Sequence, residues 1–205
     1  MRRTLVLATA ALLAVAACGG PSGDPPRSAE PTGAAPAATS AAAPLPDTVD
    51  SERNATDVMY LQMTLAHHEP TAALLDLGRT KATRDDVRGL AGDLATAIAA
   101  ETRTITGWLE GWGEPLVSDA HPDAHAAHGG LPVLGDKEIA ELGRMGAEGF
   151  DTAFLNMLIG HQHGAAELAR MEAASGQNPQ VKALAARTDE AVRAQIQQLL
   201  RMVAG

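Results

Sequence analysis

Two stretches of the chain decide the fold: DVMYLQMTLAHH at residues 57–68 and DTAFLNMLIGHQ at residues 151–162. They align without a gap at an offset of 94, so that an aspartate, a methionine and a histidine recur at equivalent places. The pairs are Asp57 with Asp151, Met63 with Met157, and His67 with His161. The alignment continues through a second helix-length segment, where Val87 matches Val181. The repeat predicts two equivalent helical hairpins, which together make an all-α, ferritin-like four-helix bundle.

The helix boundaries can be placed from capping residues and glycines. We expect helices over about 54–79, from after Thr83 to about 110, from 136 to 175, and from 179 to the end. The third should be interrupted around residues 146–149, where glycines cluster. Thr83 is a plausible N-cap for the second helix, and Asn178 followed by Pro179 is a strong start signal for the last.

Composition supports helices and excludes several classes of partner. Of 205 residues, 42 are Ala and only five are aromatic, which argues against a β-sandwich or barrel. The formal net charge of −9 disfavours nucleic acid and anionic membrane surfaces as partners. With one Cys in the chain, an intramolecular disulfide and a Cys-rich metal site are excluded.

The N-terminus has the pattern of a bacterial lipoprotein signal. Basic residues precede a short apolar run in residues 1–17, and the run ends in VAAC at residues 15–18. We expect Cys18 to carry a covalent lipid, such as palmitate, that anchors the protein at the extracytoplasmic face of the cell membrane. The alternative is an ordinary secretory signal with an incidental Cys. The membrane is thus expected as a partner through the lipid anchor only.

Three further segments follow the signal. Residues 18–50 are rich in Pro, Ala and Gly, which predicts a disordered tether. Residues 51–205 are expected to form the bundle, with repeats at about 54–113 and 136–205 and a His-rich connection at 114–135. That length suffices for one hydrophobic core. The sequence does not determine the oligomeric state.

Histidine and methionine are the informative side chains for function. Met63 and His67 are four residues apart on one helix face, and Met157 and His161 repeat the pattern. Imidazole with thioether suits copper, especially Cu(I). His68 and His163 are second choices. The alternative weighs equally: buried histidines are commonly hydrogen-bonded core residues, and methionine commonly fills gaps in a core.

A second histidine cluster lies in the connection, at His121, His125 and His128. Short His-rich tracts bind metal as neutral imidazole, so this loop is a weak auxiliary site; a solvated loop is the alternative. Enzyme motifs are missing from the sequence. It contains no Glu-x-x-His, no His-Glu-x-x-His, no phosphate loop and no nucleophile elbow, so we do not expect an enzyme.

The same residues resemble a known family, the domain of unknown function 305 proteins, over about residues 50–203. The resemblance implies a ferritin-like four-helix fold, often in secreted proteins or lipoproteins, some of them associated with copper or silver binding and tolerance. Two departures stand out: the second copy has His161-Gln162-His163 in place of adjacent histidines, and the connection contains no Met. The matching positions are Asp57 to Ala72, Leu90-Ala91, Trp108-Leu109, Trp112-Gly113, and Asp151 to Ala165.

These observations lead to a principal hypothesis and two alternatives. The principal one is a surface-anchored lipoprotein that binds copper for buffering, tolerance or delivery, with His67 and His161 as ligands and Met63 and Met157 as soft partners. The first alternative is a structural or protein-interaction lipoprotein whose His and Met residues only pack. A redox or metal-transfer enzyme is a weaker third reading.

Overall fold

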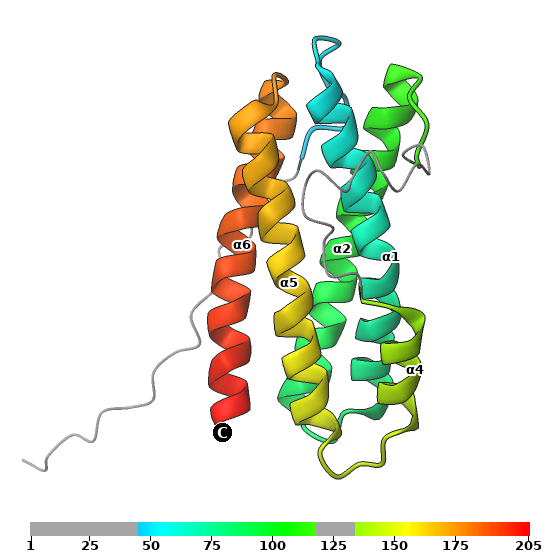
Figure 1. Ribbon diagram of the computed structural model, residues 1–205, viewed down its shortest axis with the longest axis vertical. Coiled ribbons are helices and arrows are strands. Elements are labelled where there is room, and N and C mark those ends of the chain that lie inside the picture. Colours follow the sequence, from blue (N-terminus) through cyan, green and yellow to red (C-terminus); the bar gives the residue numbers. More distant parts are fainter. Residues whose placement is uncertain (1–44, 118–133) are drawn as a thin grey trace, which may run out of the picture. The chain divides into compact units, whose positions relative to one another are not determined.

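A computed structural model describes residues 45–117 and 134–205 of the chain. Cys18 and the histidine loop of residues 121–128 lie outside the described residues. The described residues are helical and contain no strand, which confirms the all-α fold (Figure 1). The helices are α1 (Ala55–Lys81), α2 (Asp85–Trp112), α4 (Asp136–Arg144), α5 (Phe150–Ser175) and α6 (Pro179–Ala204). Within these ranges, no helix has the length and apolarity needed to cross a membrane.

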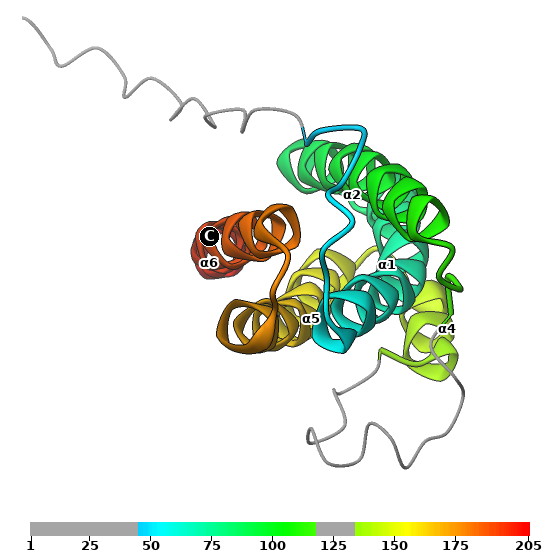
Figure 2. The ribbon, with the colours of Figure 1, turned by 90° about the horizontal axis from the view of Figure 1, so that it is seen from above.

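The two repeats form two antiparallel hairpins that pack through their first helices. α1 pairs with α2 and α5 pairs with α6, while α1 and α5 lie against each other along the middle of the bundle. Figure 2 shows this arrangement from above, with α2 and α6 on the outside. The short α4 contacts α1 and α5. The repeat therefore places residues 57–68 and 151–162 on the two helices that share the central interface.

Three of the helix boundaries follow the predicted signals. Asn54 begins α1 with a capping box, because it accepts a hydrogen bond from the backbone N–H of Asp57 while the Asp57 carboxylate accepts one from Asn54 N–H. Asn178 caps α6, with Pro179 in the first turn. The predicted break before α5 is present, but it separates two helices, α4 and α5, and does not interrupt a single one (Figure 1). Gly149 ends the break with a φ of 77°, a conformation that favours glycine.

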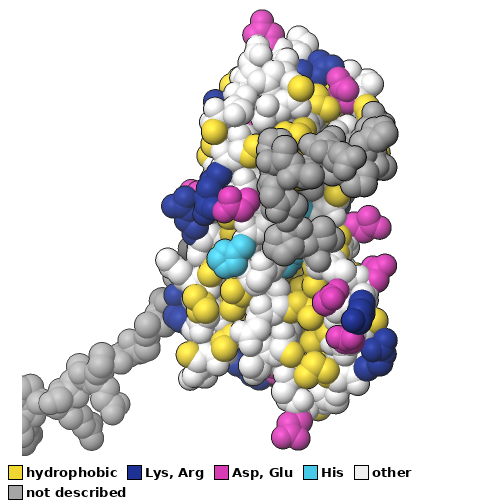
Figure 3. All heavy atoms as spheres, viewed as in Figure 1, with side chains coloured by type: hydrophobic (Ala, Val, Ile, Leu, Met, Phe, Trp, Pro, Cys, Tyr) yellow, Lys and Arg dark blue, Asp and Glu magenta, His cyan; other side chains and the backbone are white. Residues whose placement is uncertain are grey.

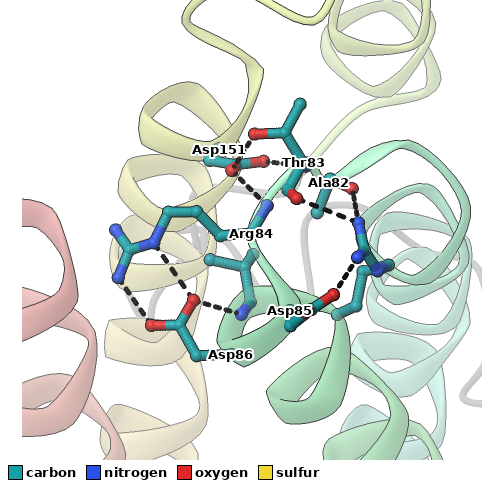
Figure 4. A network of polar contacts seen from close by, with 8 residues as sticks. Ala82, Thr83, Arg84, Asp85, Asp86 and Asp151 are labelled. Carbon is teal, nitrogen blue, oxygen red and sulfur yellow. Dashed lines mark hydrogen bonds and ion pairs between the residues drawn. The ribbon is translucent and has the colours of Figure 1, made fainter.

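The predicted N-cap of α2 was wrong. Arg84, not Thr83, occupies that position, and no side chain caps the helix. The Thr83 hydroxyl donates instead to Asp151 of the other hairpin at 2.6 Å, and the N–H groups of Thr83 and Arg84 donate to the same carboxylate (Figure 4). The Thr83 hydroxyl, which local sequence rules assign to a helix cap, therefore makes a hydrogen bond between the two hairpins instead.

The core consists of two separate apolar clusters, one towards each end of the bundle. The lower cluster surrounds Phe150 and Phe154 and includes Leu74 and Leu199. The upper cluster surrounds Tyr60 and Trp108. Along α1 and α5, the segment between the two clusters carries polar side chains. These include Thr71, His67 and His68 of α1, and His161 and Gln162 of α5.

Candidate functional site

His67 and His161 meet at the α1–α5 interface. Their imidazole rings stack with centroids 3.8 Å apart and planes within 7° of parallel. The two residues occupy equivalent positions in the repeat, so the local twofold relation of the hairpins brings the same side chain from each side to one place. The predicted convergence of the two histidines is therefore present. Figure 3 shows the surface of the molecule in the view of Figure 1, with histidine side chains exposed at mid-height.

Hydrogen bonds fix how each ring is oriented. His67 Nε2 lies 3.2 Å from the carbonyl oxygen of His161, and His161 Nε2 lies 3.3 Å from the carbonyl oxygen of His67. Because a carbonyl only accepts, both Nε2 atoms must carry the proton when they make these bonds. The two rings therefore join α1 to α5 through reciprocal side-chain to backbone bonds.

Thr71 gives a second constraint on His161. The Thr71 hydroxyl donates to the carbonyl of His67, one turn earlier on α1, at 2.6 Å. The same oxygen is 2.6 Å from His161 Nε2, and since its own proton is used it accepts from that nitrogen. The network thus assigns the Nε2–H tautomer to His161 and leaves Nδ1 as a lone-pair acceptor.

That Nδ1 atom is buried and has no hydrogen-bond partner among the described residues. Only 5% of His161 is exposed. A buried nitrogen lone pair without a donor is destabilising, and native structures usually fill such a position with a proton donor, a water molecule or a cation. The atom is therefore a point in the described structure where a ligand would be stabilised.

The histidines are held in their neutral form. Burial, with a smaller contribution from the neighbouring His161, lowers the pKa of His67 to about 3, against the opposing effect of the bond to the His161 carbonyl. Burial also lowers the pKa of His161. Stacking adds a second effect, because two protonated imidazoles in contact would repel each other. Neutral imidazole is the form that coordinates metal.

His68 extends the polar layer towards α2. Its Nδ1 is 2.9 Å from the Thr102 hydroxyl, and its Nε2 is 3.7 Å from a carboxylate oxygen of Glu101. Burial lowers the pKa of His68 to about 4 and raises the pKa of Glu101. In the second hairpin, Gln162 and Gln195 stand at the positions equivalent to His68 and Glu101, and there the two side chains hydrogen-bond to each other. The polar pair is thus repeated, but only the first copy is ionisable.

The other predicted ligands lie elsewhere. His163 is exposed on the outer face of α5. Met63 packs against the upper apolar cluster and Met157 against the lower one, so the two thioethers are in different parts of the core. Within residues 45–117 and 134–205, no three His, Cys, Asp or Glu side chains are placed to share one metal ion.

Sequence reasoning missed three residues of this layer: Thr71, Glu101 and Thr102. Thr71 was detectable in principle, because it follows His67 by four residues and so lies on the same helix face. Its equivalent in the second copy is Ala165, and a search for repeated residues passes over it for that reason. Glu101 and Thr102 lie on another helix, and their contact with His68 depends on the packing of α1 against α2.

Comparison with known proteins identifies the family. The family described as "Domain of unknown function (DUF305)" matches residues 57–203, almost the whole folded part. Comparison with curated proteins gives no match.

Two crystal structures have the same fold. A DUF305 protein from Streptomyces coelicolor, provisionally designated as secreted, is 23% identical with a TM-score of 0.68, over 73% of this chain and 92% of that one. A DUF305 fragment from Deinococcus radiodurans is 22% identical with a TM-score of 0.64, over 74% of this chain and 97% of the other. At these identities the likeness establishes the fold alone.

Proposed function

The chain belongs to the DUF305 family, whose description assigns no activity, and from the site itself we propose that it binds a soft or borderline metal ion, copper in the first place, outside the cytoplasmic membrane. The observation that carries this proposal is the buried Nδ1 of His161, which the Nε2–H tautomer leaves as an acceptor and which has no hydrogen-bond partner among the described residues. A metal ion would supply the missing interaction without a proton donor.

The donor set favours an ion that accepts few ligands. His67 and His161 offer two neutral imidazoles, with His68 as a further candidate. Hard ions such as Mg²⁺ and Ca²⁺ prefer six or more oxygen ligands, and structural Zn²⁺ takes four. Cu(I) and its analogue Ag(I) are stable with two or three neutral ligands. Met63 or Met157 would complete such a site only if its side chain left its place in the apolar core.

The proposed location follows from the N-terminal signal. Residues 1–17 and Cys18 have the pattern of a lipoprotein leader, and the similar Streptomyces coelicolor protein is provisionally designated as secreted. We propose that a lipid on Cys18 keeps the bundle at the extracytoplasmic face, where the protein would buffer or deliver copper.

Equilibrium titration tests the proposal. The purified chain is titrated with Cu(I) in competition with a chromophoric chelator, and separately with Ag(I) and Cu(II). We expect binding at least as tight as micromolar, lost in the double variant His67→Gln, His161→Gln. His163→Gln is the matched control, because it removes an exposed histidine from the same helix. If no ion binds at micromolar concentration, the proposal is wrong; if only a triple variant of His121, His125 and His128 loses binding, the site is the loop.

A second function is favoured by one observation. Both Nε2 atoms of the stacked pair already bond to backbone carbonyls across the α1–α5 interface, which is a structural task. A bundle that serves only as a structural or interaction module would keep the same melting temperature with and without metal. Binding, by contrast, stabilises the folded state by about 2.7 kcal/mol when the free ligand is at a hundredfold excess over the Kd.

A further inference from the structure

The chain segment before α1 crosses the upper end of the bundle and is attached to it. We call residues 45–52 the strap. The indole N–H of Trp108 donates to the carbonyl of Pro46 at 3.0 Å, and that of Trp112 donates to the carbonyl of Asp50 at 3.0 Å. Leu45 packs against the upper apolar cluster. Figure 2 shows the segment passing over the helix ends. The strap therefore joins the N-terminal part of the chain to the bundle through both tryptophans.

Asn178 connects the strap to the interior. Its side-chain amide donates to the carbonyls of Asp50 and Glu52, at 3.1 and 2.8 Å. Its backbone N–H donates to Asp57 at 2.9 Å. Asn178 is fully buried, so these bonds have no water competing for them. Asn178 thus links the strap to Asp57.

A second buried acid lies beside Asp57. Glu172 of α5 is 0% exposed, as is Asp57, and neither of its carboxylate oxygens has a hydrogen-bond partner among the described residues. The Glu172 carboxylate curls against the backbone of Gly176, where an added Cβ would fall 1.9 Å from its Oε1 atom. Two ionised carboxylates in one buried place are strongly unfavourable, so one of them must carry a proton while the structure is intact.

The hydrogen bonds differ between the two acids. Its oxygens accept from the backbone N–H groups of Asn54, Gln177 and Asn178, and such bonds favour the charged form. Glu172 receives no such bond, so the proton belongs to Glu172. Two further titratable groups interact with Glu172: Tyr60, on the same helix as Asp57, and Lys182 from α6.

We propose that Glu172 is a pH-sensitive latch for the strap. While Glu172 is protonated, Asp57 is the only charged acid in this buried place and keeps its bond to Asn178, and Asn178 keeps the strap docked. When Glu172 loses its proton to solvent, the two carboxylates repel, Asp57 and Asn178 separate, and the strap detaches from the two tryptophans. This latch lies at the upper end of the bundle and does not depend on the proposed metal site.

The range in which the latch would act is mildly alkaline. Burial and the adjacent Asp57 raise the pKa of Glu172 to about 8, while Lys182 acts to lower it. Release would free eight residues, which extended span at most about 28 Å. If Cys18 is anchored as proposed, the change would increase the distance that the bundle can reach from the membrane.

The two tryptophans make the latch measurable, because they are the only ones in the chain and both bond to the strap. Tryptophan fluorescence of the full chain is recorded from pH 6 to 10, with circular dichroism at each pH to follow the helices. We expect a single fluorescence transition with a midpoint near pH 8 and unchanged helix content. Glu172→Gln should abolish it. Glu167→Gln, an exposed position on the same helix, should leave it unchanged.

A further variant tests the latch even if Glu172→Gln folds poorly. Lys182→Met removes the positive charge that favours ionised Glu172, so the midpoint should move to higher pH. The proposal is overturned if the wild-type signal does not change between pH 6 and 10. It is equally overturned if the transition persists in Glu172→Gln or if Lys182→Met leaves the midpoint in place.

Discussion

Asp57 and Asp151 each accept hydrogen bonds from the backbone of the turn in the opposite hairpin. Asp57 of α1 binds the α5–α6 turn, and Asp151 of α5 binds the α1–α2 turn (Figure 4 shows the second). The N–H donors are equivalent in the repeat: Gln177 and Asn178 at 3.0 and 2.9 Å for Asp57, and Thr83 and Arg84 at 2.8 and 2.9 Å for Asp151. The two contacts lock the hairpins to each other at both ends.

Asp151→Asn should therefore destabilise the bundle. Burial alone would raise the pKa of Asp151, but the bonds from Thr83 and Arg84 keep it below its ordinary value, so the ionised form is the one the fold uses. An amide has only one acceptor oxygen for these three bonds, and we expect a loss of about 2 kcal/mol in the free energy of unfolding. Urea denaturation measures it. Asp93→Asn, at an exposed position on α2, should stay within about 0.5 kcal/mol of wild type.

The repeat explains how much could be predicted from sequence. The offset of 94 predicted both hairpins, and pairing of equivalent residues predicted that His67 and His161 would lie together. The same reasoning could not find what the halves do not share: Thr71 faces His161, but its equivalent is Ala165. Composition assigned residues 45–50 to the tether, but their carbonyls accept hydrogen bonds from Trp108 and Trp112 of the bundle. A rule based on composition cannot predict such contacts.

Thr71→Val should weaken the preference of His161 for one tautomer. The variant keeps the shape of the side chain but removes the nearer of the two acceptors for His161 Nε2–H and leaves the His67 carbonyl at 3.3 Å. It also removes the hydroxyl that donates to that carbonyl. We expect the ¹⁵N chemical shifts of the His161 ring to move from the pure Nε2–H form towards a mixture of tautomers, with a stability loss of about 1–2 kcal/mol. Thr96→Val is the control, because its hydroxyl bonds only within its own helix. Unchanged His161 shifts would show that Thr71 does not set the tautomer.

Stability should fall as the medium is acidified, because the buried histidines resist protonation. Burial lowers the pKa of His68 from 6.5 to about 4. Between these values the unfolded chain binds a proton that the folded chain does not, so this residue lowers the free energy of unfolding by up to about 1.4 kcal/mol for each unit of decrease in pH. His68→Gln, which copies Gln162 of the second hairpin, should reduce the slope of stability against pH in that range. His163→Gln, at an exposed site, controls for the loss of a histidine; an equal slope in wild type and His68→Gln would contradict the assignment.

Glu172 should affect stability with the opposite sign. Its pKa is raised from 4.5 to about 8, so between these values the folded chain holds a proton that the unfolded chain has lost. Stability then decreases as the pH rises through this interval, by up to about 1.4 kcal/mol per unit, and levels off above it. Glu172→Gln should remove this decrease and be more stable than wild type at pH 8. If the variant is no more stable than wild type at pH 8, the buried acid does not lower the free energy of unfolding, and the assignment is wrong.

Gly78 and Gly92 offer a matched pair for the packing of the two hairpins. Gly78 occupies the position equivalent to Glu172 of the second copy. Because Gly78 has no side chain, the ring of Phe154 packs directly against its backbone. A Cβ at this position would lie 2.5 Å from Phe154 Cζ and 3.0 Å from Ala91 Cβ. Gly78→Ala should therefore destabilise the bundle by about 1–3 kcal/mol, because two helices and a buried ring would have to shift. At Gly92, nothing lies within 4 Å of an added Cβ, and Gly92→Ala should stabilise α2 by up to about 1 kcal/mol. Thermal denaturation of both variants measures the difference, and equal melting temperatures would show that Phe154 does not need the space above Gly78.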